Sequence, residues 1–323
     1  MKIMITGVAG FIGFHVADRL LSQNFEIFGI DNINDYYDVN LKHARLNLLS
    51  KYTNFHFLKY DITKEKEIEE VFKEYKFSKV LHFAGQAGVR YSVDHPEAYV
   101  RENIQGFFNV MNNSRLNNVE HFVYASSSSV YGDNPEQESR ESDYTDTPIS
   151  FYAATKKSNE LMAYSYSHVY GMQTTGLRFF TVYGPWGRPD MALSKFTKSI
   201  IAGEVIDLYN HGQMVRDFTY IDDVVDCVVS ILDGINSVAT ENKFNIFNVG
   251  NGKPRILFDY ISAIEKGLGI KAKINMADRQ VGDVLKTVAC IDHINNYIHY
   301  EPNFEIEEGI ENFIEWYRGF YQN

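Results

Sequence analysis

The chain has 323 residues, of which 45% are hydrophobic, and its 42 acidic and 31 basic side chains give a net charge of −11. A folded chain of this length buries about 75% of the surface that its unfolded form exposes, so a large core is expected and a disordered protein is excluded. The acidic balance argues against a non-specific nucleic-acid binder and against a polybasic protein of the membrane surface.

Cysteine content and hydropathy bear on the compartment. Two cysteines, Cys227 and Cys290, cannot form a disulfide framework and indicate reducing conditions. No stretch of 18 apolar residues occurs, and the histidines and cysteines have no metal-ligand spacing. We therefore expect a cytoplasmic protein that binds no metal and does not enter a membrane.

Strand-like and helix-like segments alternate through the first half of the chain. Strands are expected at 2–6, 25–30, 80–83, 121–125 and 173–179, and helices at 11–22, 64–74, 97–115 and 151–170. This alternation predicts an α/β fold with a doubly wound parallel sheet.

The pattern changes after about residue 180, where turn residues cluster at 183–190 and the elements become shorter. A smaller, mixed α/β C-terminal domain is expected there, while an apolar run at 243–249 predicts a strand that returns to the first sheet. The expected domains are 1–180 plus about 220–252, and about 181–219 plus 253–323.

A glycine-rich loop joins the first strand to the first helix. In the sequence GVAGFIG at 7–13, Gly7 permits a tight turn, Gly10 lets backbone amides approach a pyrophosphate, and Gly13 lets helix and strand pack closely. Asp31 ends the next strand, 18 residues later, where a carboxylate accepts both ribose hydroxyls and favours NAD. This predicts a Rossmann domain, although Asp31 as a plain turn residue is the alternative.

A tyrosine and a lysine lie four residues apart in the expected helix at 151–170. This spacing places Tyr152 and Lys156 on one helix face. A neighbouring ammonium stabilises a phenolate, so Tyr152 is a candidate general base. The pair alone occurs by chance in many helices, and the order of motifs along the chain gives it weight.

With these motifs in order, the chain resembles the extended short-chain dehydrogenase/reductase family of nucleotide-sugar epimerases, dehydratases and decarboxylases. The matching segments are TGVAGFIG at 6–13, Asp31, HFAG at 82–85, SSSSVYGD at 126–133, YAATK at 152–156, LRFFTVYGP at 177–185 and VRDFTYIDD at 215–223. The resemblance implies bound NAD, a nucleoside-diphosphate sugar as substrate, and a catalytic set of Ser127, Tyr152 and Lys156.

The resemblance also implies a set of cofactor-binding residues, in which Asp61 as a plain turn residue is an even alternative. They are Gly7, Gly10, Phe11, Ile12, Gly13, Asp31, Asn32, Asp61, Ile62, Phe83, Ala84, Gly85, Asn103, Ser126, Tyr152 and Lys156.

Three positions separate the branches of this family. Ser128 and Ser129 stand where the dehydratases have an acid pair, Ser129 stands where decarboxylases have a glutamate, and Thr181 stands where galactose epimerases usually have asparagine. Three hydroxyl groups at a sugar C6 position would suit a carboxylate.

The segments at 85–90 and 187–191 look like those of the branch acting on UDP-glucuronate. They contain Arg90 and Arg188, of which Arg188 is expected near the substrate carboxylate or is a solvated loop residue. Arg216 resembles the diphosphate-binding arginine of the family. The remaining substrate candidates are Tyr209, which is equally well a core tyrosine, Gln280 and Asp283; the family's usual proline before Gly282 is absent here.

The leading expectation is NAD-dependent 4-epimerisation of a UDP-sugar, with UDP-glucuronate converted to UDP-galacturonate through a 4-keto intermediate. The alternatives are a 4-epimerase of a neutral UDP-hexose or UDP-N-acetylhexosamine, a UDP-glucuronate decarboxylase, and a non-catalytic NAD-binding regulator. The family resemblance further implies a homodimer formed through the helices near 97–115 and 152–170.

Overall fold

The computed structural model describes residues 1–133, 138–234, 243–278 and 284–322. The chain divides into two compact units. Unit 1 contains Met1–Gly132, Glu141–Phe179 and Val228–Phe247, and unit 2 contains Asp133–Arg140, Phe180–Cys227 and Asn248–Asn323. The expected domain ranges differ at their edges, since the described residues 133, 138–140, 180, 220–227 and 248–252 group with unit 2.

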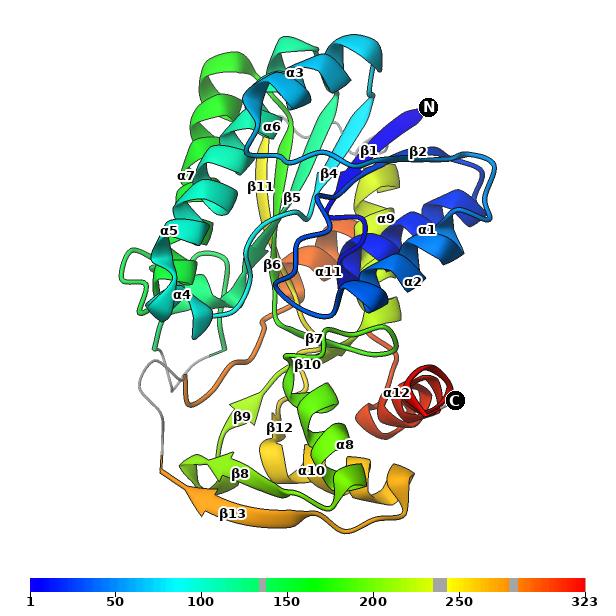
Figure 1. The fold of residues 1–323 in the computed structure, drawn as a ribbon. Coiled ribbons are helices and arrows are strands. Elements are labelled where there is room, and N and C mark those ends of the chain that lie inside the picture. The colour runs from blue at the N-terminus through cyan, green and yellow to red at the C-terminus, as the bar shows by residue number, and fades with distance from the viewer. Residues whose placement is uncertain (134–137, 235–242, 279–283, 323) are drawn as a thin grey trace. The chain divides into compact units, whose positions relative to one another are not determined.

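A seven-stranded sheet with the order β11-β6-β5-β4-β1-β2-β3 is formed by unit 1, except for the last two residues of β11 (Figure 1). Its strands are β1 (Lys2–Thr6), β2 (Glu26–Ile30), β3 (Phe55–Leu58), β4 (Lys79–His82), β5 (His121–Ser127), β6 (Thr174–Phe179) and β11 (Phe244–Val249). Each pairing from β6 to β3 is parallel. This confirms the predicted doubly wound sheet and the return of the 243–249 strand.

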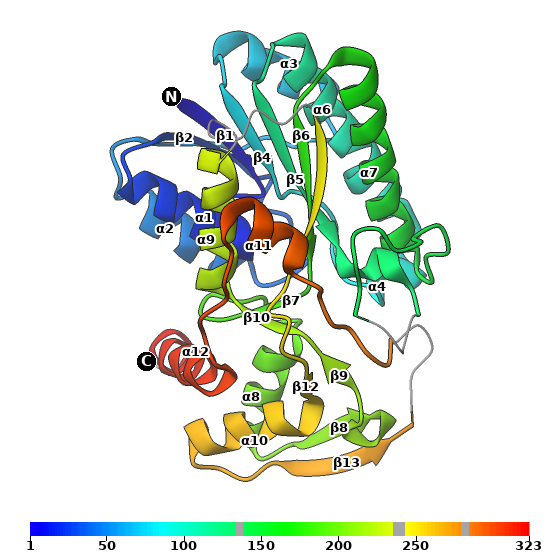
Figure 2. The same ribbon diagram turned by 180° about the vertical axis from the view of Figure 1, so that it is seen from behind.

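Helices cover both faces of this sheet. Helices α1 (Phe11–Ser22) and α2 (Val39–Leu49) lie on one face, and α3 (Glu65–Glu74), α6 (Phe107–Leu116) and α7 (Phe151–Tyr170) lie on the other (Figures 1 and 2). Because both faces are covered, the central strands are buried almost throughout, as their continuous apolar sequences require.

The helix expected at 97–115 is interrupted in the structure. The segment contains α5 (Pro96–Tyr99), a π-helical turn η1 (Val100–Gly106) and then α6, and it is preceded by the short α4 (Tyr91–Asp94). A π-helical turn shifts the side-chain register, and such turns are frequent at functional sites. Here the turn carries Asn103, whose contacts are described below.

Unit 2 contains short two-stranded sheets and helices. Its elements are β7 (Thr181–Tyr183), α8 (Ala192–Ala202), β8 (Val205–Tyr209), η3 (Asn210–Gly212), β9 (Val215–Arg216), β10 (Phe218–Tyr220), the first half of α9 (Ile221–Gly234), β12 (Arg255–Ile256), α10 (Leu257–Leu268), β13 (Lys273–Ala277), α11 (Asp292–Ile298) and α12 (Ile306–Tyr321). The pairs are β10 with β7, β12 with β9, and β13 with β8.

A buried carboxylate organises unit 2. Asp217, between β9 and β10, accepts hydrogen bonds from the backbone N–H groups of Asn251 (2.7 Å), Gly252 (2.9 Å) and Ala289 (3.0 Å). Burial raises the pKa of Asp217, and these three bonds oppose that effect. One side chain thus ties together three segments that are distant in sequence.

Candidate active site

The glycine-rich loop follows β1 and turns directly into α1. Gly7 has a φ of +72°, and its N–H donates to the carbonyl of Ile30 at 2.8 Å. A Cβ atom at position 13 would lie 2.2 Å from the carbonyl oxygen of Gly7, so only glycine permits this approach of helix and loop. The tight turn at Gly7 and the close packing of the helix at Gly13, both predicted from the sequence, are therefore present in the structure.

The N-terminus of α1 is suited to an anion. Its N-cap residue is Gly10, no side chain caps the helix, and the first turn contains no acidic residue. The first N–H groups of a helix and its dipole favour negative charge at this end. The diphosphate of a dinucleotide fits this arrangement, and Phe11 and Ile12 contribute the first backbone amides of the helix.

Asp31 lies directly after β2 beside the loop. Its carboxylate accepts hydrogen bonds from the N–H groups of Ala9 (3.1 Å) and Ile33 (2.9 Å). Burial raises its pKa, and these bonds, with the charges of Lys42 and Arg45, oppose the rise. A carboxylate held in this way has further acceptor capacity for the hydroxyls of a ribose. Asn32 follows it and accepts from the N–H of Asn34 at 3.1 Å.

Two other cofactor candidates have local packing functions. Asp61 accepts hydrogen bonds from the N–H (2.8 Å) and the hydroxyl (2.7 Å) of Thr63, which is the geometry of a turn residue. Ile62 is buried, and its side chain fills the space next to Gly106. The contacts of Asp61 agree with the alternative that it is a turn residue, and its assignment as a cofactor residue stays a prediction.

The segment after β4 is held close to the glycine loop and to the π-helical turn. The N–H of Ala84, between Phe83 and Gly85, donates to Thr6 Oγ1 at 3.2 Å. Asn103 accepts from the N–H of Gln86 at 2.7 Å and donates to the carbonyl of Gln86 at 3.0 Å.

Asn103 also donates to Thr155 Oγ1 of α7 at 3.0 Å. Both the oxygen and the nitrogen of its side-chain amide are therefore hydrogen-bonded within the protein. We infer that Asn103 shapes the cofactor-side loop through these bonds.

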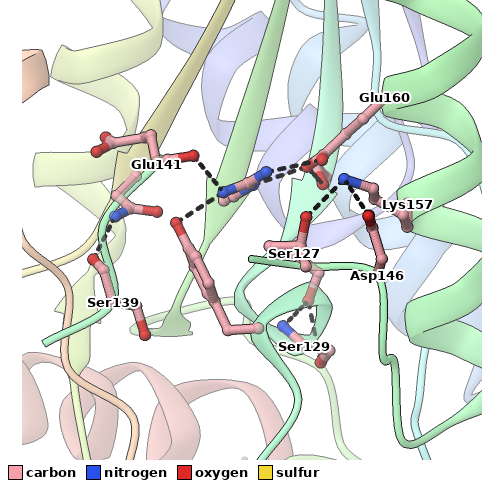
Figure 3. Close-up of polar contacts among 12 residues, drawn as sticks. Ser127, Ser129, Ser139, Glu141, Asp146, Lys157 and Glu160 are labelled. Carbon is pink, nitrogen blue, oxygen red and sulfur yellow. Dashed lines mark hydrogen bonds and ion pairs between the residues drawn. The ribbon is translucent and has the colours of Figure 1, made fainter. Parts of the chain in front are cut away.

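The serine run begins at the carboxyl end of β5 and enters η2 (Ser128–Tyr131). The Ser127 hydroxyl donates to Ser129 Oγ at 3.2 Å and accepts from the Ser129 N–H at 3.1 Å. Ser127 is 7% exposed, and Ser128 and Ser129 are half-buried. The chain turn thus gathers the hydroxyls of Ser127 and Ser129 at one strand end (Figure 3).

Tyr152 and Lys156 lie one turn apart near the start of α7. Ser150 caps this helix by accepting from the N–H of Ala153 at 3.1 Å. Lys156 Nζ donates to the carbonyl of Ala125 in β5 at 2.9 Å and lies 5.9 Å from the centroid of the Tyr152 ring. Burial lowers the pKa of Lys156 to about 8, so the ammonium form is retained at neutral pH at a cost in desolvation.

A buried ion pair lies one turn further along α7, and the sequence analysis did not identify it. Glu160 and Arg178 form two hydrogen bonds of 2.8 Å each, and both side chains are 3% exposed. The hydroxyl of Ser126, which is expected among the cofactor contacts, donates to Glu160 Oε1 at 2.6 Å. Glu160 and Arg178 lie 18 residues apart, on α7 and β6, so no local spacing in the sequence signals the pair.

The substrate candidates are divided between the two units. Arg90 is exposed just before α4 in unit 1. In unit 2, Thr181 begins β7 and its N–H donates to the carbonyl of Asp217 at 3.1 Å, while Tyr209 ends β8 and is half-buried. Gln280 and Asp283 lie outside the described residues.

The two arginines of unit 2 have different surroundings. Arg188 Nε donates to Asp190 Oδ1 at 2.9 Å, and Arg188 Nη2 donates to Asp190 Oδ2. Burial alone would raise the pKa of Asp190, but Arg188 outweighs it and the pKa is lowered. Arg216 donates to the carbonyls of Val215 (2.9 Å) and Leu285 (3.3 Å), which orient the guanidinium within β9.

A parallel doubly wound sheet with a glycine loop after β1 and a carboxylate after β2 defines a dinucleotide-binding protein. Residues 3–250 match the model of the NAD dependent epimerase/dehydratase family. This match covers more than half of the chain, and the chain belongs to this family.

Individual relatives match along their whole length. Protein CapI of Staphylococcus aureus is 46% identical over 337 residues, with 100% of both chains covered. A Rhizobium meliloti protein described as a probable UDP-glucuronate 4-epimerase is 42% identical over 330 residues, with 98% of this chain and 97% of its own covered. UDP-glucuronic acid 4-epimerase from Bacillus cereus, solved with UDP-glucuronic acid and NAD, has a TM-score of 0.93 at 29% identity, with 99% of this chain and 100% of its own covered.

These comparisons confirm the predicted family, the NAD cofactor and the assignment of the chain as an NAD-dependent epimerase. In the described part of the chain, no helix is long and apolar enough to cross a membrane. Within the same residues, no group of three or more His, Cys, Asp or Glu side chains is arranged to hold a metal ion.

Proposed function

We propose that the chain interconverts UDP-glucuronate and UDP-galacturonate by NAD-dependent epimerisation at C4 of the sugar. The observation that carries the proposal is that Ser127, Tyr152 and Lys156 lie on adjoining elements of unit 1, with Lys156 bonded to the strand that presents Ser127. The relatives from Rhizobium meliloti and Bacillus cereus support the choice of sugar.

Tyr152 is the proposed general base. Its phenolate removes the proton from O4 as C4 becomes a carbonyl, and it returns that proton when the alcohol forms again. The Ser127 hydroxyl orients O4, and the ammonium of Lys156 stabilises the phenolate and holds the cofactor ribose. Bound NAD, held by the glycine loop and Asp31, would supply the hydride chemistry at C4. The 4-keto sugar would have to turn over in the site so that its other face receives the hydride.

The cofactor is assigned to unit 1 and the nucleotide sugar chiefly to unit 2. The glycine loop would hold the diphosphate of NAD and Asp31 its adenosine ribose. Arg216 would bind the diphosphate of the UDP-sugar, since a guanidinium offers paired donors to phosphate oxygens. Arg188 is bonded to Asp190 through Nε and Nη2 in this structure, so a contact with a substrate carboxylate would compete with this ion pair.

A uronate substrate places an extra demand on the site. The 4-keto intermediate is a β-keto acid, which loses carbon dioxide when the bond from C5 to the carboxylate aligns with the carbonyl π system. Hydrogen bonds from Ser128, Ser129 and Thr181 would hold the carboxylate out of that alignment. The hydroxyl of Ser129 is already oriented by its contact with Ser127.

To test the choice of sugar, UDP-glucuronate, UDP-glucose and UDP-N-acetylglucosamine are supplied separately and the products are identified by NMR. We expect turnover of UDP-glucuronate to its C4 epimer. Faster turnover of a neutral or N-acetylated sugar would favour the alternative epimerases, and release of a UDP-pentose would favour a decarboxylase. Retained NAD with no turnover of any of the three sugars would favour a non-catalytic regulator.

The first variant prediction concerns the base. Tyr152→Phe removes the acid–base group, so we expect epimerisation to fall by at least a thousandfold while NAD remains bound, since proton transfer contributes about 10²–10⁴-fold and loss of the phenolate adds to this. Tyr170→Phe, at an exposed tyrosine of the same helix, is the matched control and should retain full activity. Near-normal turnover by Tyr152→Phe would exclude the assignment.

We also propose a homodimer in the cytoplasm. Several large apolar side chains are exposed on α6 and α7, the two helices predicted to form the dimer, and exposed apolar surface favours a protein contact. They are Phe108, Leu116, Leu161, Tyr164 and Val169. A second copy of the chain is the proposed occupant of this face, and the free, buried thiols of Cys227 and Cys290 suit a reducing compartment.

A further inference from the structure

The ion pair between Glu160 and Arg178 is more extensively connected than a simple salt bridge. Besides its two bonds to Glu160, Arg178 donates to the hydroxyl of Tyr131 at 2.9 Å and to the carbonyl of Glu141 at 3.4 Å (Figure 3). Its guanidinium carbon also lies 4.8 Å from the centroid of the Tyr131 ring. The pair therefore joins α7, β6, the end of η2 and the segment that follows it.

Glu160 also connects α7 to the strand that carries the candidate catalytic serine. It accepts the hydrogen bond from the Ser126 hydroxyl, while Lys156 donates to the carbonyl of Ala125. Successive turns of α7 thus bind successive residues of β5, and Ser127 is the next residue of that strand. Tyr152 precedes Lys156 by one further turn on the same helix face.

This arrangement points to a function beyond stability. Replacing a buried ion pair with apolar side chains of similar volume is often neutral or stabilising, so a fold does not need such a pair to remain stable. The charges here lie one turn from Lys156, in surroundings where water does not screen them. Their opposite signs keep the net charge beside the catalytic face of α7 near zero.

We propose that Glu160 and Arg178 are positioning residues of the epimerase, which fix α7 against β5 and balance the charge beside Tyr152 and Lys156. The inference rests on the proposed catalytic functions of Ser127, Tyr152 and Lys156. It assigns no contact with substrate or cofactor to either member of the pair.

Other titratable groups surround these residues. Tyr124 of β5 faces the pair, and burial, with the charge of Glu160, raises its pKa. Burial alone would lower the pKa of Arg178, but its bonds to Glu160 more than offset this and raise it. His82 of β4 lies near Lys156, and burial, with the Lys156 charge, lowers its pKa to about 3, so it is neutral at working pH. Tyr131 completes the set around Arg178.

Removing the anion and removing the cation should move the kcat–pH profile in opposite directions, which a purely structural role of the pair does not predict. Glu160→Gln leaves the Arg178 cation uncompensated, which favours a phenolate nearby. Arg178→Met leaves the Glu160 anion, still bonded by Ser126 and one turn from Lys156, which disfavours a phenolate. We expect the acid limb of the kcat–pH profile to move down by about one pH unit in the first variant and up by about one in the second.

The same variants are measured for kcat and KM on the UDP-sugar that the wild type turns over. We expect kcat to fall at least tenfold with KM changed by less than threefold, because the substrate contacts remain while the geometry of the base is lost. Asp146→Asn removes an exposed partner of Lys157 on the same helix and is the control, with kcat and profile unchanged (Figure 3).

Single variants of a buried pair can fail to fold, so the double variant Glu160→Leu with Arg178→Met is decisive in that case. It keeps the volume without buried charge, and we expect it to fold and bind NAD but to retain a kcat at least tenfold below wild type. A double variant with wild-type kcat and pH profile would overturn the inference. So would single variants whose acid limbs move in the same direction or remain in place.

A substrate-free measurement separates this inference from the proposed function. Ultraviolet difference titration against Tyr152→Phe reports the ionisation of Tyr152 in each background. Opposite displacements in Glu160→Gln and Arg178→Met would support the charge balance even if no tested sugar reacts. Unchanged titrations would contradict it even if UDP-glucuronate is the substrate.

Discussion

Lys156 illustrates how one residue combines position and charge. The amine is buried, burial lowers its pKa to about 8, and its bond to the Ala125 carbonyl directs it along the strand that ends in the serine run. A partly desolvated ammonium interacts strongly with a neighbouring phenolate, because water does not screen the pair. The tyrosine–lysine spacing is visible in the sequence, whereas the burial that gives it strength is not.

The hydroxyl groups proposed to hold the substrate carboxylate are tested at the residue scale. Ser129→Ala or Thr181→Ala removes one donor, so the carboxylate of the 4-keto intermediate has more freedom to align for loss of carbon dioxide. We expect the ratio of UDP-pentose to epimerised product to rise by at least threefold, measured by NMR of the reaction mixture. Ser199→Ala, a half-buried serine near the C-terminal end of α8, is the control. An unchanged product ratio in both variants would rule out the clamp.

At the scale of elements, β5 carries buried polar side chains at both of its ends. Its first residue, His121, bonds to Thr175 Oγ1 of β6 at 2.9 Å, and its last residues bond to Glu160 and to Ser129. Burial, with the charge of Lys79, lowers the pKa of His121 to about 3. The histidine is thus neutral in the folded protein and is protonated on unfolding below its ordinary pKa of 6.5.

The pH dependence of the free energy of unfolding tests whether His121 is buried and neutral in β5. Between pH 6.5 and about 3, the unfolded state binds the proton and the folded state does not, so stability is lost as pH falls. From pH 7 to pH 5 we expect His121 to contribute a loss of about 2 kcal/mol to the free energy of unfolding, measured by guanidinium titration.

His82, whose pKa burial also lowers to about 3, adds a loss of similar size. His121→Gln should therefore lose about 2 kcal/mol less than the wild type between pH 7 and pH 5. His43→Gln, at an exposed helix position, is the control. A pH dependence unchanged in His121→Gln would mean that the histidine is not buried as the structure has it.

Two helices have the bounds that the sequence predicts, whereas a third segment, predicted as one continuous helix, contains a π-helical turn. The helices at 11–22 and 151–170 begin and end where expected, because glycine and serine signals mark their ends. The segment at 97–115 has a continuous helical pattern, and its π-helical turn depends on the bonds of Asn103 to the loop after β4 and to Thr155. Periodicity alone does not contain those partners.

At the scale of the whole molecule, the net negative charge limits how the protein can attract anionic ligands. The net charge of −11 excluded nucleic acid as an expected partner, yet NAD and a UDP-uronate are themselves anionic. Their binding must therefore depend on local groups, such as the N-terminus of α1, Lys156 and Arg216. Long-range attraction contributes little to substrate capture by a protein of the same overall sign.

The proposed dimer is tested by solution mass. Leu161→Glu places a charge on the exposed apolar face of α7, where the side chain is 57% exposed, and a buried charge at an interface is costly. We expect light scattering to give twice the chain mass for the wild type and the single chain mass for the variant. Ile270→Glu, at an exposed aliphatic residue of unit 2, should leave the dimer intact. A monomeric wild type would refute the proposal.

The sequence by itself was sufficient to predict the doubly wound fold, the glycine loop, the acidic residue after the second strand (Asp31) and the tyrosine–lysine pair of α7. These features depend on local spacing, and a strand, turn and helix carry their signals within a few residues. Only the tertiary structure decided that Glu160 pairs with Arg178, that Arg188 is bonded to Asp190, and that Ser126 faces the ion pair. Two of these three contacts join residues far apart in the chain, and their strength comes from burial, which exists only after the layers have packed.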